Sequence, residues 1–78
     1  MIEFVTYLAK ELVDQTREVV VTETTKGNTV VYTLKVNAQD LGKIIGKNGA
    51  NFQAMQTLLT SVSVKYSKRG VLKLDTSA

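Results

Sequence analysis

Residues 40–52 read DLGKIIGKNGANF and join two segments that both have helical hydrophobic spacing. The aliphatic pair Ile44 and Ile45 closes the first segment, and Gly46 follows where a left-handed residue commonly ends a helix. Gly49 comes before the second segment, in which apolar residues recur every three or four positions from Phe52 onward. The stretch therefore predicts a tight junction between two helices, with a glycine at each end of the connecting loop.

The chain before this junction predicts a helix followed by a β-hairpin. Over residues 2–15, apolar residues recur at helical spacing and charged residues occupy the other faces. The period changes to two over residues 18–25 and 29–37, and residues 26–28 (Lys-Gly-Asn) supply the turn between these strands.

The chain from residue 37 onward predicts two helices and a last strand. A short helix covers residues 41–45, with Asn37 or Ala38 near its start, a longer one runs from Phe52 toward Tyr66, and a strand covers residues 71–75. The long crossover favours a parallel, right-handed connection between strands 29–37 and 71–75. The prediction is an α+β fold, in which three helices cover one face of a three-stranded mixed sheet with strand 29–37 in the centre.

Length and composition limit the functions that this chain can have. Its 78 residues form one small domain, with a core over about residues 2–75 and a frayed tail at 76–78. Because cysteine and histidine are absent, disulfide frameworks, Cys/His zinc sites and His-dependent nucleophilic triads are excluded. The carboxylates are dispersed, so we expect no catalytic residue, no metal and no cofactor. The N-terminus has no basic region followed by a long apolar run, so we expect neither a signal peptide nor a membrane span.

The net charge of +3 is unevenly distributed along the chain. Residues 1–40 hold four basic and six acidic residues, whereas residues 41–78 hold six basic residues and one acidic residue. A basic half favours nucleic acid as a partner, although a basic face that only maintains solubility has the same composition. Lys65, Lys68 and Arg69 either extend such a basic path or form a solvated helix end that suits the helix dipole.

The helix junction has the chemistry of a phosphate-binding loop. Without side chains at Gly46 and Gly49, a sugar-phosphate backbone can approach the main chain closely, and the next helix directs the positive end of its dipole there. Lys47 adds a cation at the loop tip, and Lys43 lies one turn upstream. The alternative is that both glycines only permit a sharp turn between packed helices.

The stretch IIGKNGANFQAM at residues 44–55 resembles the core signature of the KH domain. That signature is an aliphatic pair, G-x-x-G, and apolar residues three and six positions after the second glycine, here Phe52 and Met55. The predicted order of elements resembles the type II, bacterial form of the fold, in which the extra helix and strand come first. Over about residues 2–75, the chain resembles the small stand-alone bacterial KH proteins of the KhpA type.

The resemblance implies that single-stranded RNA lies in a groove between the two helices and the sheet, where the G-x-x-G loop clamps about four nucleotides. Lys43 would assist electrostatically, and Ile45 would form part of the apolar groove floor. Ala50 occupies a position that is often basic in stand-alone relatives, which implies weaker RNA binding. By position, the implied RNA-binding residues are Lys43, Ile45, Gly46, Lys47, Asn48, Gly49 and Ala50.

The resemblance also implies a biological role and partners. It implies a non-catalytic, cytoplasmic post-transcriptional regulator or RNA chaperone, forming a homodimer or a heterodimer with a larger KH-containing RNA-binding protein. In the alternative hypothesis, the KH scaffold serves mainly for dimerisation and RNA contact is incidental, as Ala50 and the small net charge suggest. The interface has no clear signal, and Val31 on the polar side of its strand is a candidate. An enzyme acting on nucleotides is disfavoured because the chain contains no G-x-x-x-x-G-K-[ST] loop.

Overall fold

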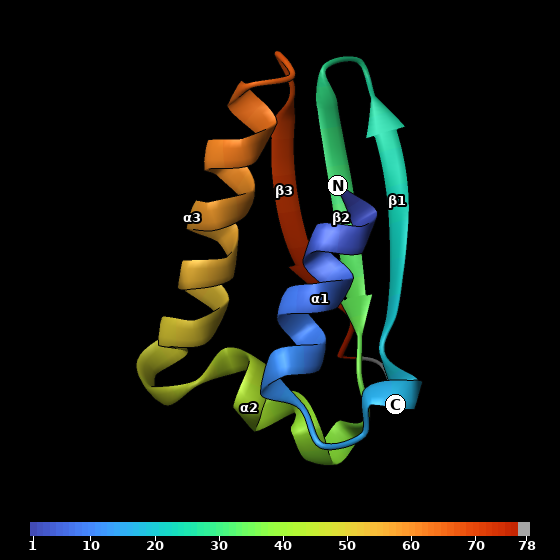
Figure 1. The fold of residues 1–78 in the computed structure, drawn as a ribbon, viewed down its shortest axis with the longest axis vertical. Coiled ribbons are helices and arrows are strands. Elements are labelled where there is room, and N and C mark those ends of the chain that lie inside the picture. The colour runs from blue at the N-terminus through green and yellow to red at the C-terminus, as the bar shows by residue number, and fades with distance from the viewer. Residues whose placement is uncertain (77–78) are drawn as a thin grey trace.

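The computed structural model describes residues 1–76 as helices packed on one face of a small sheet (Figure 1). Residues 77–78 of the predicted frayed tail lie outside the described part of the chain. In chain order the elements are α1 (Ile2–Leu12), η1 (Thr16–Glu18), β1 (Val20–Lys26), β2 (Thr29–Lys35), η2 (Ala38–Asp40), α2 (Leu41–Ile45), η3 (Lys47–Gly49), α3 (Ala50–Val64) and β3 (Arg69–Leu74).

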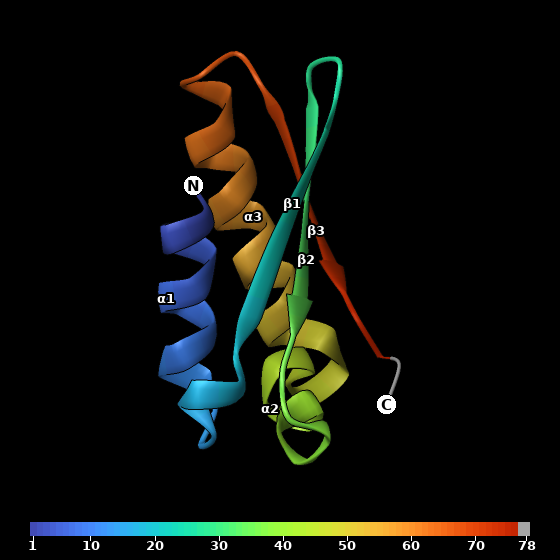
Figure 2. The same ribbon diagram turned by 90° about the vertical axis from the view of Figure 1, so that its right-hand side faces the viewer.

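The sheet has the strand order β1-β2-β3, with β2 in the centre. β1 pairs antiparallel with β2, and β3 pairs parallel with β2 in a register that places Val31 opposite Val71. Figure 2 shows α1 and α3 on the same side of the sheet, which leaves the other face open. The structure confirms the predicted fold class, an α+β fold with a three-stranded mixed sheet and three helices on one face.

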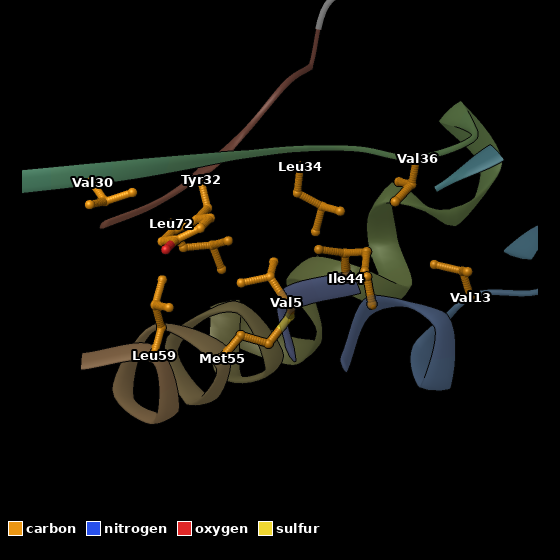
Figure 3. Packing of buried hydrophobic residues seen from close by; sticks show 11 residues of the cluster. Val5, Val13, Val30, Tyr32, Leu34, Val36, Ile44, Met55, Leu59 and Leu72 are labelled. Atoms are coloured by element: carbon orange, nitrogen blue, oxygen red, sulfur yellow. The ribbon is translucent and has the colours of Figure 1, made fainter. Parts of the chain in front are cut away.

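The core lies between the helices and the central strand (Figure 3). Alternation along β2 directs Val30, Tyr32 and Leu34 toward the helices, and all three side chains are buried. The helices and the other elements contribute the rest of the buried apolar cluster: Val5, Ala9, Val13, Val36, Ile44, Met55, Leu59 and Leu72. Burial of this apolar surface is the main stabilisation available to a domain without disulfides.

Close packing of α3 on β3 depends on Gly70. A Cβ atom at this position would lie 2.2 Å from the Ser63 Oγ and 3.0 Å from the Leu59 Cγ. Ser63 is itself buried, so α3 and β3 approach more closely here than a larger residue at position 70 would allow.

Several element ends differ from the prediction, and the starts of two strands do so because they depend on partners distant in sequence. Glu18 belongs to the η1 turn and not to a strand, since β1 pairs only from Val20 onward. β3 begins at Arg69, two residues before the predicted start, because Arg69 pairs with Thr29 and donates its backbone N–H to the Asn28 carbonyl. α3 ends at Val64, before the predicted Tyr66.

Candidate functional site

The loop between α2 and α3 reverses the chain through backbone conformations that favour glycine. Gly46 has φ 75° and ψ 176°, Asn48 has φ 56° and ψ 28°, and Gly49 has φ 76° and ψ 12°. The Gly46 N–H donates to the Gly42 carbonyl at 2.8 Å, and the Gly49 N–H donates to the Gly46 carbonyl at 3.2 Å. Asparagine is among the few other residues that adopt a left-handed conformation readily, which explains its place between the glycines.

The two glycines have different surroundings. A Cβ atom on Gly46 would lie 2.7 Å from Asn51 Cγ and 2.9 Å from the Asn51 backbone nitrogen. The Asn51 side chain occupies this space because its Nδ2 donates to the Lys43 carbonyl at 2.8 Å, which ties the first turn of α3 to α2. A Cβ atom on Gly49 would meet nothing within 4 Å, so the loop is open to an approaching ligand at Gly49.

The N-terminus of α3 offers positive potential beside Gly49. No acidic residue lies in the first turn of this helix, and no side chain caps it. Lys47 is exposed at the loop, and Ala50 is exposed at the start of the helix without adding a charge. The helix dipole and Lys47 therefore favour an anion at the same place.

Lys43 is less available than its position in the sequence suggests. Its ammonium group pairs with Asp14 and lies 3.6 Å from an Asp40 carboxylate oxygen. The hydrogen bond to Asp14 is the main cause of a raised Lys43 pKa, and the charges of both carboxylates act in the same direction. Lys43 therefore stays charged, but the two carboxylates beside it balance its charge at the base of the loop.

Asp40, which sequence reasoning left among the dispersed carboxylates, is the buried anchor of this region. Its side chain is 2% exposed, and its Oδ2 accepts the Gln15 backbone N–H at 3.0 Å. That hydrogen bond is the main cause of a lowered Asp40 pKa; the Asp14 N–H and Lys43 act in the same direction, against desolvation. Asp40 thus fixes the segment after α1 to the start of α2. In the sequence, the one local feature that could have indicated this role is the i, i+3 spacing of Asp40 and Lys43.

An apolar pocket of about 280 Å³ lies beside the loop. Ile45 from the end of α2 is 39% exposed and lines it. The other lining residues are Gly49, Phe52 and Gln53 from the loop and α3, and Leu74 from the end of β3. Sequence reasoning expected Ile45 in the floor of the groove and Gly49 in the phosphate-binding loop, and both residues line this pocket. It missed Leu74, since only the parallel pairing of β3 brings that residue close.

The free edge of β3 is partly blocked by Gln56 of α3. The Gln56 Nε2 donates to the Gly70 carbonyl at 3.0 Å, and its Oε1 accepts the Leu72 N–H at 2.7 Å. The side-chain amide thereby occupies two edge groups that would otherwise be free. Since outward-pointing backbone groups alternate along a strand, the next ones are the Leu72 carbonyl and the Leu74 N–H, at the end of the strand that borders the pocket.

Other candidate residues lie elsewhere. Lys65, Lys68 and Arg69 lie beyond the C-terminal end of α3, the opposite end from the loop (Figure 1). A helix of 15 residues separates the two ends by about 22 Å. None of the helices in residues 1–76 is long and apolar enough to span a membrane.

The helix–loop–helix with its two glycines, packed on a mixed sheet in this element order, defines a type II KH domain. Comparison with known families gives a match over residues 2–74 to the family described as KhpA/KhpB, KH domain. The chain belongs to this family, which consists of RNA-binding KH proteins and is not a known enzyme family.

The relatives that match this chain are bacterial proteins of nearly the same length. "RNA-binding protein KhpA" of Chlamydia pneumoniae is 42% identical over 74 residues, covering 95% of each chain. The protein of the same name from Aquifex aeolicus is 44% identical over 72 residues, covering 92% of this chain and 91% of its own. The Chlamydia trachomatis serovar D protein of that name is 48% identical over 63 residues, or 81% of each chain. No solved structure matches significantly.

Proposed function

We propose that this chain is a cytoplasmic, non-catalytic protein that binds single-stranded RNA and acts as a post-transcriptional regulator or RNA chaperone. The RNA backbone lies over residues 46–49, and one or two bases enter the pocket between Ile45 and Leu74. The main support is the combination at one place of an open Gly49, an acid-free helix N-terminus and an apolar pocket. The curated relatives are named as RNA-binding proteins, which favours the same ligand.

Each part of the site contacts a different part of the RNA. Lys47 and the start of α3 attract phosphates, while Gly49 allows the backbone to approach the main chain. Phe52 and Leu74 offer apolar surface to a base, and the Leu72 carbonyl and Leu74 N–H offer an acceptor and a donor to its edge. Lys43 supports the loop through its pairing with Asp14 and Asp40, in addition to a general electrostatic effect. Ala50 adds no charge, so binding is weak.

The test is binding of a mixed-sequence RNA of about four nucleotides, the length that a KH loop clamps. With about two phosphate contacts, each with a slope near −0.7, a fourfold rise in salt weakens binding about sevenfold. The variant Lys47→Asp with Asn48→Asp places negative charge where phosphates lie, and we expect it to keep its fold and lose binding.

A matched control carries the same change of charge away from the loop. Lys10→Glu with Thr16→Glu alters two exposed positions on α1 and η1, and we expect it to bind RNA nearly as the wild type does. Equal loss of binding in both variants would mean that net charge alone matters. Undiminished binding by the loop variant would refute the proposed site.

A second candidate function, dimerisation, is favoured by an apolar surface between α1 and α3. Tyr7 and Leu58 are 61% and 47% exposed, and a pocket of about 200 Å³ opens beside Leu58. Leu8, Leu12, Ala54 and Met55 add apolar atoms to the lining of that pocket. Glu11 and Asn51 complete the lining, so the pocket is an apolar surface with a polar border, and exposed apolar patches with polar borders mark interaction sites. We propose that this face forms the homodimer, or the heterodimer with a larger KH-containing RNA-binding protein.

Leu58→Lys tests the interface. We expect this variant to sediment as a monomer under conditions in which the wild type dimerises. Val64→Lys is the matched control, because Val64 is apolar, 68% exposed and on the same helix but outside the pocket lining. Identical association states for both variants and the wild type would exclude this face.

A further inference from the structure

The sheet face turned away from the helices carries charge of one sign. Paired residues on neighbouring strands share a face, so Lys26, Lys35, Arg69 and Lys73 all lie on this open face. No acidic residue of the three strands shares it; Glu23 pairs with the buried Tyr32 and belongs to the helix-facing side. The open face of the sheet is therefore a purely basic surface within β1, β2 and β3.

These four charges are exposed and outnumber the acidic residues of the sheet. Three of the chain's acidic residues pair with other groups, since Glu3 pairs with the amino terminus and Asp14 and Asp40 pair with Lys43. The chain has ten basic and seven acidic residues, so everything outside these four is slightly negative. Asp75 follows β3 at the end of the sheet next to Lys35, and Lys26 and Arg69 lie at the other end. This face therefore holds four of the ten basic residues and, within the three strands, no acidic one.

The spacing of the charges fits a nucleic-acid backbone. Lys26 and Arg69 both pair with Thr29 across neighbouring strands, which places them about 10 Å apart. Lys73 lies four residues along β3 from Arg69, or about 13 Å. Phosphates of a stacked strand follow one another at about 3.4 Å along its axis, so the face spans roughly three to four of them.

The other side chains of this face are small, and they are threonines and valines. Val31 and Val71 pair at the centre and are half-buried, and Thr22 pairs with Thr33 beside them. Threonine hydroxyls donate hydrogen bonds to phosphate oxygens, whereas no aromatic ring on this face can stack on a base. Val20, which pairs with Lys35 at one end of this face, is an exposed apolar side chain, but it is not one of the Trp, Phe or Leu side chains with which amphipathic helices enter a membrane. This chemistry favours contact with a phosphate backbone without reading of sequence.

The open face is continuous with the candidate site at the edge strand. Leu74 lines the pocket on the helix side, and the preceding residue, Lys73, points to the open face. We propose that the open sheet face is a second, sequence-independent binding surface for the RNA backbone, which receives the strand that leaves the pocket over β3. The inference rests on the proposed function for its ligand, but it concerns a separate surface and separate residues.

The experiment compares two RNA lengths and two variants with equal loss of charge. One RNA has about four nucleotides, as a KH loop clamps, and the other is about three times longer. The sheet variant is Arg69→Gln with Lys73→Gln, and the control is Lys10→Gln with Arg17→Gln on α1 and η1. All four positions are exposed, so both variants keep the fold, which circular dichroism checks.

The sheet variant should keep wild-type affinity for the short RNA and lose affinity for the long one. Losing two contacts lowers its salt slope by about 1.4, so a fourfold rise in salt weakens the wild type about sevenfold more than the sheet variant. The control should follow the wild type. Equal affinity of the sheet variant and the control for the long RNA would overturn the inference. Equally tight binding of polyglutamate of matched charge would overturn RNA as the ligand.

The outcome for the loop is read separately. If Lys47→Asp with Asn48→Asp leaves short-RNA binding unchanged while the sheet variant loses the long RNA, the proposed function at the loop fails and the sheet surface stands. If the loop variant loses both RNAs while the sheet variant behaves as the control does, the loop stands and the sheet surface is excluded.

Discussion

Replacing each glycine of the loop by alanine should separate its role in folding from its role in binding. At Gly46, the backbone conformation is one that is essentially restricted to glycine, and strain of this kind costs about 1–3 kcal/mol. The new Cβ would also lie 2.9 Å from the Asn51 backbone nitrogen, and overpacking of this kind costs about 1–3 kcal/mol more. The sum is a large share of the free energy of unfolding, which is roughly 4–12 kcal/mol for a domain of this length.

At Gly49, the same replacement is much milder. Its left-handed conformation costs alanine about 1–2 kcal/mol, and a Cβ would contact no atom within 4 Å. Part of that cost is offset because alanine lowers the entropy of the unfolded chain by about 0.4–1 kcal/mol. We therefore expect Gly49→Ala to fold and Gly46→Ala to unfold far more easily.

Urea unfolding followed by circular dichroism measures the difference. For a small protein the slope is about 1–3 kcal/mol per molar urea, so a further loss of about 3 kcal/mol in Gly46→Ala moves the midpoint by about 1–3 M. Gly49→Ala, although folded, should bind the short RNA more weakly, because its Cβ occupies the space that the backbone needs. Equal midpoints for the two variants would refute the packing role of Gly46. Unchanged RNA binding by Gly49→Ala would refute close approach at that position.

Three further predictions concern the framework of the site. Gly70→Ala should destabilise the protein by about 1–3 kcal/mol, and adding Ser63→Ala should restore part of the loss in thermal unfolding; no recovery would contradict the 2.2 Å contact as the cause. Gln56→Leu removes two hydrogen bonds to the β3 edge, which costs roughly 1–3 kcal/mol, and it should speed amide exchange at Leu72; unchanged exchange would contradict the edge contact. The lowered pKa of Asp40 stabilises the fold fully above the ordinary Asp pKa of about 3.9, and that stabilisation is lost as the pH falls below it. Asp40→Asn should therefore reduce the amount by which the free energy of urea unfolding falls at acid pH. If that fall is unaltered in the variant, it arises from other carboxyl groups.

The parts of the fold that were predictable are those in which a local pattern and tertiary burial agree. Alternation in β2 placed Val30, Tyr32 and Leu34 on one face, and that face is the one covered by helices. β1 is different, because nearly all its side chains are exposed and its strand conformation depends on pairing with β2. A strand defined by its partner has ends that its own residues do not specify, which is why Glu18 was placed in the wrong element.

In the candidate site, the position of the loop was predictable from sequence, but the contacts that hold the loop and complete the pocket were not. Glycine spacing and the change of helical pattern are local signals, so the turn at residues 46–49 could be located from sequence. The occupation of the space over Gly46 by Asn51, and the pairing of Lys43 with Asp14, depend on how α1, α2 and α3 pack. Leu74 joins the pocket through a parallel pairing across a long crossover, and no short-range pattern contains that information.

The distribution of charge on the surface was also only partly predictable from the sequence. Along the chain the contrast lies between an acidic first half and a basic second half, and this pointed to the second half as the nucleic-acid surface. In the fold, Lys26 and Lys35 of the first half share one sheet face with Arg69 and Lys73 of the second, because strand register decides which side chains are neighbours. Lys43 of the second half is instead neutralised by Asp14 and Asp40 of the first. The basic side chains available to a polyanion are therefore determined by the sheet face on which they lie and not by the half of the chain from which they come.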